Sequence, residues 1–252
     1  METHFSPTRQ DVKRYRNLRA LAMDLNHRII KTIPKRAFDD IGRALGILRK
    51  GVLVFETEDM SSVLMDCCLY DWFQNGKNVV QRYSEHYPME PGTDDRFLLD
   101  AYLRAKYRVL MVLSAVSGAG LRCRDLLNNE ELFLMDVAFS RGVVEAGVAL
   151  ATRTLPLGDY WITTGAALPI NSDTARKMKI ATPRWREGQH GVALSLVRTC
   201  LAAGAAEHIR YIEPRTTNGQ VKEPRARRWW RRFGSLWQRP TGLGSTEPTQ
   251  SS

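Results

Sequence analysis

The 252-residue sequence contains only four cysteines and no long apolar run. Cys67, Cys68, Cys123 and Cys200 show no C-x-x-C spacing, so we expect reduced thiols. The adjacent Cys67 and Cys68 have apolar neighbours, which favours packing as small hydrophobes over a redox or metal pair. No window approaches the roughly 20 apolar residues of a membrane-spanning helix, and no secretory signal is visible. These absences favour a cytoplasmic protein.

The sequence also lacks the motifs of common catalytic classes. It contains no G-x-S-x-G, and Gly118-Ala119-Gly120 does not match a phosphate-binding loop, so a hairpin loop is the simpler interpretation. The five histidines are scattered, with no H-x-x-x-H pair to suggest zinc. The sequence therefore favours a protein that is not an enzyme and that holds no cofactor.

Positive charge is in excess and unevenly distributed, with a net charge of +10. Residues 1–50 carry 12 basic and 5 acidic side chains, whereas residues 51–100 carry 3 and 10. We expect these two blocks to neutralise each other where they pack together. Residues 214–252 carry 8 basic and 2 acidic side chains. The high isoelectric point therefore mainly reflects the C-terminal residues, and is weak evidence for a nucleic-acid-binding core.

Apolar periodicity predicts helices in the first half of the chain. Ser6-Pro7 resembles an N-cap followed by proline, and apolar residues from Val12 to Ile33 recur every three or four positions until Pro34. Val52–Phe55 has the composition of a strand. Further helices are predicted over residues 38–50, 58–73, 78–87 and 96–106, the last of them capped by Thr93-Asp94-Asp95.

From Tyr107 the pattern changes to short β-like runs separated by turn residues. Five short strands within about sixty residues suggest a small closed or nearly closed barrel of the SH3 or OB type. The predicted strands span residues 107–116, 121–126, 131–139, 148–155 and 160–166.

These patterns together predict an α+β fold. It has a helical N-terminal half, a small five-stranded β-barrel-like module (SH3/OB type), a closing helix and a flexible basic tail. The predicted divisions are a mainly helical region at 8–106, the β-module at 107–170, C-terminal helices packing on the body at 171–212, and a linker, amphipathic Arg/Trp segment and disordered end at 213–252.

An acidic stretch is the best candidate for a chemical site. Its carboxylates include Glu58, Asp59, Asp66 and Asp71, and paired carboxylates could hold Mg²⁺ or Mn²⁺. Spacings of seven and five residues do not place Asp59, Asp66 and Asp71 on one helical face, and Asp59 is more simply an N-cap. We favour a capped helix whose acidic face meets the basic N-terminal helices. An enzyme with a metal at Glu58, Asp59 and Asp66 is the alternative.

The β-module has basic residues that could contact a single-stranded nucleic acid. They are Lys106, Arg108, Arg122, Arg124 and Arg153. Four acidic residues leave the same region near neutrality, namely Asp125, Glu130, Glu131 and Asp136. We therefore favour a structural or protein-contacting barrel over a nucleic-acid-binding one.

The segment at residues 225–239 is rich in arginine and tryptophan. On a helix at about 100° per residue, its apolar residues occupy an arc of roughly 120° and its arginines occupy the remainder. Such a helix suits docking on protein, on nucleic acid or on an anionic membrane surface. We expect a non-enzymatic protein that binds an anionic partner, preferably nucleic acid, with peripheral membrane association as an alternative. The predicted binding residues are Arg227, Arg228, Trp229, Trp230, Arg231, Arg232, Phe233 and Trp237.

Three short stretches, at Phe55–Asp66, Gly92–Asp95 and Gly120–Leu127, carry a resemblance to other proteins. They resemble uncharacterised bacterial proteins associated with the SecA C-terminal-type zinc motif, in which a helical region precedes a small β-module. The similarity covers about residues 10–170. This sequence has no cysteine after Cys200, so it cannot carry the zinc knuckle found in some of those proteins. The resemblance implies a bacterial cytoplasmic protein of unknown activity, with no metal site and no catalytic residue.

Overall fold

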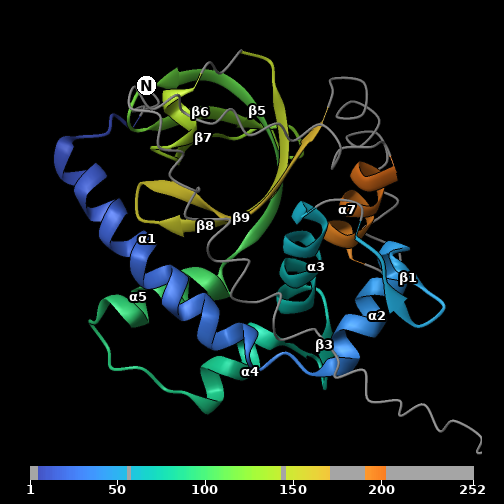
Figure 1. Ribbon diagram of the computed structural model, residues 1–252. Coiled ribbons are helices and arrows are strands. Elements are labelled where there is room, and N and C mark those ends of the chain that lie inside the picture. The colour runs from blue at the N-terminus through green and yellow to red at the C-terminus, as the bar shows by residue number, and fades with distance from the viewer. Residues whose placement is uncertain (1–4, 56–57, 143–145, 171–190, 203–252) are drawn as a thin grey trace, which may run out of the picture. The chain divides into compact units, whose positions relative to one another are not determined.

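In the computed structural model, the described residues are 5–55, 58–142, 146–170 and 191–202. The chain divides into two units, Met1–Ile209 and Arg210–Ser252, of which the second is outside the described residues. The first unit contains helices followed by a closed five-stranded barrel (Figure 1). The predicted α+β class with a helical N-terminal half is therefore confirmed.

Six α-helices belong to the described part of the chain. They are α1 Arg9–Ile30, α2 Lys35–Leu45, α3 Glu58–Tyr70, α4 Val79–His86, α5 Asp94–Leu103 and α7 Val192–Ala202. Two short hairpins join them, β1 Leu48–Arg49 with β2 Val52–Leu53, and β3 Phe73–Gln74 with β4 Lys77–Asn78. None of these helices is both long and apolar enough to cross a bilayer.

Helix α1 begins two residues later than the predicted start at Ser6-Pro7. Its cap is Thr8, whose hydroxyl accepts a hydrogen bond from the Asp11 amide, while the Asp11 carboxylate accepts one from the Thr8 amide. This capping box satisfies two amides at once, which explains why the helix starts there. The helix ends at Ile30, shortly before Pro34.

Helix α2 ends before the predicted stop near Gly51. Gly46 closes it with a φ of +79°, a conformation that glycine adopts readily. Leu48, which was predicted to be helical, instead pairs with Leu53 in the first hairpin. The predicted cap of α5 at Thr93 is confirmed.

The barrel strands follow the order β5-β6-β7-β9-β8, and β8 pairs back with β5. Among these strands only β7 and β9 run parallel, at Leu134 and Trp161. This order is that of an OB-type barrel rather than an SH3-type meander. The strands are β5 Lys106–Val116, β6 Gly120–Asp125, β7 Glu131–Met135, β8 Ala149–Leu157 and β9 Tyr160–Ile170.

All five predicted β-runs are strands, but the third is shorter than expected. Strand β7 ends at Met135, and residues 139–141 form a 3-10 helix, η1 Phe139–Arg141. The Asp136 carboxylate caps that turn by accepting a hydrogen bond from the Phe139 amide. The helix η1 therefore lies between β7 and β8 in the chain, and β7 pairs with β9 rather than with β8.

Alternating side chains give the barrel two apolar faces. The inner face is filled by Leu110, Val112, Leu121, Cys123 and Leu134. The outer face of β5, β8 and β9 joins one continuous core with the helices. Helix α7 packs on this core through Leu196, Val197 and Cys200, which confirms the predicted closing helix over Val192–Ala202.

The oppositely charged N-terminal blocks meet between α1 and α5, as their composition predicts. Arg14 pairs with Asp94, and Arg28 pairs with Asp95. These side chains remain close to half exposed, so each pair contributes only about 0–1 kcal/mol. The position of α1 therefore depends mainly on its buried apolar face, with these pairs at its surface.

The contact between β6 and β7 generates a test of the barrel. A Cβ atom at Gly120 would lie 2.2 Å from the Leu134 carbonyl oxygen and 2.9 Å from the Met135 Cα. We expect G120A to lower the unfolding free energy in urea by about 1–3 kcal/mol, because backbone must move to admit the methyl group. G191A is the control, since nothing lies within 4 Å of its added Cβ. Equal stability of the two variants would contradict this packing.

Candidate functional site

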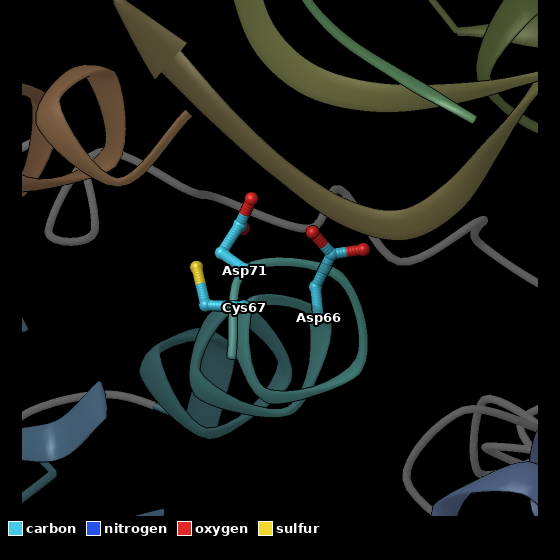
Figure 2. A group of neighbouring side chains, drawn as sticks. All are labelled: Asp66, Cys67 and Asp71. Atoms are coloured by element: carbon cyan, nitrogen blue, oxygen red, sulfur yellow. The ribbon is translucent and has the colours of Figure 1, made fainter. Parts of the chain in front are cut away.

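The end of α3 brings three reactive side chains together. The carboxylates of Asp66 and Asp71 and the thiol of Cys67 lie within 4.8 Å of one another. Figure 2 shows the three side chains projecting from α3 to the same side. Asp71 directly follows α3, which ends at Tyr70, and its amide donates to the Cys67 carbonyl oxygen at 2.8 Å. Its carboxylate lies near that of Asp66 despite the five-residue spacing.

Arg153 of β8 lies between the two carboxylates. Its Nε donates to Asp66 Oδ2 at 2.8 Å, and its Nη2 donates to Asp71 Oδ2 at 2.5 Å. The other oxygen of Asp66 accepts a hydrogen bond from the Thr164 hydroxyl of β9 at 2.8 Å. Arg153 and Asp66 are each 5% exposed, and the Asp71 side chain is 15% exposed. This buried cluster connects α3 to two strands of the barrel.

Two aromatic rings enclose the guanidinium. The Cζ atom of Arg153 lies 4.3 Å from the ring centroid of Tyr70 and 5.3 Å from that of Tyr107. Within the described residues, neither tyrosine hydroxyl has a hydrogen-bond partner. The rings exclude water from the ion pairs and add cation–π attraction, which is strongest where the cation is desolvated.

Arg153 lies at an irregular point of the β8–β9 ladder. The β8–β9 register shifts between Thr152, which pairs with Ala167, and Thr154, which pairs with Thr163, so the extra residues lie in β9 opposite Arg153. Arg153 is one of the five cations that the sequence offered for nucleic-acid contact, but it is buried and paired with the carboxylates of Asp66 and Asp71. One charged residue in the otherwise uncharged run 149–157 is the pattern that signals a buried partner.

Burial sets the protonation of the cluster. It raises the pKa of Asp71 to about 6, although Arg153 opposes the rise. Burial also raises the pKa of the Cys67 thiol well above its usual range, which favours the protonated form. Burial works against the charge of Arg153, but Asp66 and Asp71 outweigh it and raise the pKa of the guanidinium. Protonation of Asp71 therefore makes the charge of the cluster more positive by one.

The donor set fits an internal ion pair better than a metal. Arg153 takes one oxygen of each carboxylate, and Thr164 takes the remaining oxygen of Asp66. A metal ion would have to displace a buried guanidinium and deprotonate Cys67, whose raised pKa opposes this. The side chains of Glu58 and Asp59 are not among those described, so the metal site predicted from them stays a prediction.

A second buried arginine closes the inside of the barrel. Arg108 Nη1 donates to Asp125 at 2.6 Å and to Glu130 at 3.1 Å, and its Cζ lies 4.4 Å from the Trp161 ring centroid. On the outer surface, Arg124 pairs with Glu131. Of the five cations named for the β-module, Arg108, Arg124 and Arg153 are therefore paired with carboxylates.

The predicted binding residues of the C-terminal segment all lie beyond the described part of the chain. They are Arg227, Arg228, Trp229, Trp230, Arg231, Arg232, Phe233 and Trp237. Their role stays a prediction from the sequence.

Comparison with known proteins gives one match. A family model described as a family of unknown function (DUF7986) matches residues 9–187, which include all of α1 to β9. No curated protein and no solved structure matches the chain. The resemblance to zinc-motif proteins is not tested by this match.

The buried arginine can be tested by removing its charge. R153M should lower the unfolding free energy in urea by about 3–5 kcal/mol, because two carboxylates stay buried without a partner. R124M removes the more exposed pair with Glu131 and should lower it by only about 0–1 kcal/mol. Replacing all three charges in D66N/D71N/R153M should recover most of the loss. Similar losses in R153M and R124M would contradict a buried cluster.

The raised pKa of Asp71 predicts a pH dependence of stability. The folded pKa of about 6 lies above the usual 3.8, so the folded state binds this proton more tightly than the unfolded state. The resulting stabilisation is complete below about pH 4 and is lost as pH rises through about 6. The difference in unfolding free energy between wild type and D71N should therefore fall across this range. D94N is the control with the opposite trend, because the hydrogen bond from Arg14 lowers the pKa of Asp94. If the difference in unfolding free energy between wild type and D71N does not change with pH, the raised pKa of Asp71 is refuted.

Proposed function

The chain belongs to the DUF7986 family of unknown function, and we propose that it is a non-enzymatic nucleic-acid-binding protein. The main contact in this proposal is the segment at residues 225–239, with its arginines on phosphates and its tryptophans on bases. One observation supports it above the others. The buried arginines of the body are paired with carboxylates, whereas residues 214–252 carry 8 basic and 2 acidic side chains of a chain with net charge +10.

The body uses its buried charges for its own structure. Arg153 is paired with Asp66 and Asp71, and Arg108 is paired with Asp125. Both oxygens of Asp66 are engaged, which favours binding over the alternative of a metal enzyme at Glu58, Asp59 and Asp66. The clustered side chains that suggested chemistry are therefore better explained as cross-links between elements.

The basic excess suits a polyanion. Of the net charge of +10, residues 214–252 contribute 8 basic and 2 acidic side chains. Arginines that neutralise phosphates release counterions, and aromatic side chains stack on bases regardless of sequence. This combination favours single-stranded nucleic acid, whose bases are accessible for stacking.

The OB-type barrel supports nucleic-acid binding only by analogy, and its own outer aromatic residue is not free to stack on a base. Barrels of the OB type bind oligonucleotides in many proteins, although a fold alone does not establish a function. Phe133 of β7 would be the stacking residue on the outer β6–β7 face, but Phe5 covers it at a ring distance of 5.3 Å. Stacking in this proposal therefore falls to Trp229, Trp230 and Trp237.

A cytoplasmic location and a bacterial source are part of the same proposal. All four cysteines are free and buried, which supports a reducing compartment. The bacterial source depends only on the resemblance of the short sequence stretches.

Peripheral membrane binding through the same segment is the second candidate. The opposed arrangement of tryptophans and arginines also suits a helix lying in an anionic lipid interface. In that case the tryptophans would supply most of the binding energy, whereas phosphate binding depends mainly on the arginines.

Salt dependence separates these uses. Binding of the full-length protein, purified free of nucleic acid, to a fluorescent single-stranded oligonucleotide should weaken steeply with salt. Replacing Arg227, Arg228, Arg231 and Arg232 by glutamine should reduce the slope of log affinity against log salt by about 3, at roughly 0.7 per phosphate contact. W229A/W230A/W237A should keep the same slope of log affinity against log salt. Its binding free energy should weaken by about 1–3 kcal/mol for each base that loses its stacking partner.

Co-sedimentation with anionic vesicles serves as the companion measurement. Oligonucleotide binding that is absent or independent of salt would contradict the proposal. Vesicle binding that is abolished in W229A/W230A/W237A, in a protein that does not bind the oligonucleotide, would establish the membrane alternative instead.

A further inference from the structure

We propose that the outward face of α1 is a second contact surface for the same nucleic acid, with Arg9, Lys13 and Arg16 on its backbone phosphates. We call these three side chains the α1 basic row. The inference rests on the proposed nucleic-acid-binding function and adds a folded surface to the contact at residues 225–239.

The other cations in this part of α1 already hold the helix to the body. Arg14 pairs with Asp94 of α5, and Arg19 donates to the backbone oxygen of Thr163 in β9 at 2.6 Å. The apolar side of the helix is buried in the core. Three faces of α1 are thus accounted for by contacts within the protein, and the basic row occupies the remaining one.

The basic row faces solvent along one line of the helix. Spacings of four and three residues place Arg9, Lys13 and Arg16 on the same side, and all three are exposed. None of them has an ion pair or hydrogen bond with another described residue. Asp11, the acid nearest in sequence, points elsewhere because it closes the capping box with Thr8. Three adjacent, unneutralised cations on a rigid helix form a positive strip.

The length of the strip fits a nucleic-acid backbone. Seven residues of helix separate Arg9 from Arg16, a rise of about 10 Å. For a strand stacked as in duplex DNA, this rise corresponds to about three phosphates at roughly 3.4 Å of axial rise each. Because the core holds α1 in place, the three cations are positioned before binding, and little ordering entropy is lost.

The strip also leads toward a further cation on the barrel. Phe5, just before α1, packs on Phe133 of β7 and on Tyr160 of β9. Phe133 is directly opposite Arg122 in the β6–β7 ladder, and Arg122 is partly exposed without an ion pair in the described chain. A strand bound along α1 would therefore continue past Phe5 onto the outer surface of β6.

The burial of α1 argues against lipid as the ligand of this row. An interfacial helix binds a membrane by inserting its apolar face between headgroups. The apolar face of α1 is committed to the core, where Leu18, Leu25 and Ile29 are at most 1% exposed. Met23, at 45% exposed, is the large apolar side chain that α1 presents to solvent among those described. Cations without an insertable apolar face suit phosphates in a polymer.

The test measures the salt dependence of oligonucleotide binding by the full-length chain. R9Q/K13Q/R16Q should reduce the slope of log affinity against log salt by about 2, at roughly 0.7 for each of three phosphates. R9K/R16K should keep the wild-type slope, because the charges remain. The matched control is K31Q/K35Q/K50N, which removes the same charge from exposed positions away from the row. The melting temperatures should agree among all variants, since none of these side chains is buried.

Each outcome separates this inference from the function on which it rests. If the wild type does not bind the oligonucleotide in a salt-dependent way, both are overturned. A second outcome overturns only the α1 surface. In it, the wild type binds and the arginine variant of segment 225–239 has a reduced salt slope, but R9Q/K13Q/R16Q has the same salt slope as K31Q/K35Q/K50N. A loss of anionic-vesicle binding in R9Q/K13Q/R16Q without a loss of oligonucleotide binding would also overturn it.

Discussion

One buried guanidinium constrains how the helices are attached to the barrel. Removing a charge from water is costly, and the cost is offset only where partners of opposite charge are held in good geometry. Arg153 meets this condition with Asp66 and Asp71 at the end of α3, while Thr164 holds the far side of Asp66. The same contacts engage both oxygens of Asp66 and one oxygen of Asp71 within the protein.

Local elements of this fold are readable from sequence, whereas the contacts between them are not. The five strands and the Thr93 cap were predicted because turn residues and alternation mark them directly. The start of α1 was missed because Ser6 and Thr8 both resemble caps, and only the reciprocal bond with Asp11 decides between them. The OB-type order depends on β7 pairing with β9, and that contact between distant residues leaves no local pattern. The partner of Arg153 was equally hidden, because the end of α3 brings Asp71 beside Asp66 despite a spacing that excludes a shared helical face.

The cations of the chain fall into two groups with different uses. Those in the barrel, such as Arg108 and Arg153, are buried and neutralised, and they hold elements together. Those of the α1 basic row are exposed and have no ion pair with another described residue, and those at residues 225–239 are predicted from the sequence to bind a partner. A nucleic acid is the partner whose chemistry matches a rigid row of cations together with a segment that combines arginine and tryptophan. In this view the OB-type barrel is chiefly a scaffold, because Phe5 already covers the aromatic residue on its outer face.

Mapping the bound surface tests the central claim most directly. Ultraviolet cross-linking of the full-length protein to a single-stranded oligonucleotide, followed by mass spectrometry of its peptides, identifies the residues in contact. We expect cross-linked peptides from two places, the first turns of α1 around Lys13 and the segment around Trp229 and Trp237. Cross-links confined to other parts of the chain, or none above the level of an unrelated protein of equal charge, would contradict nucleic-acid binding by these surfaces.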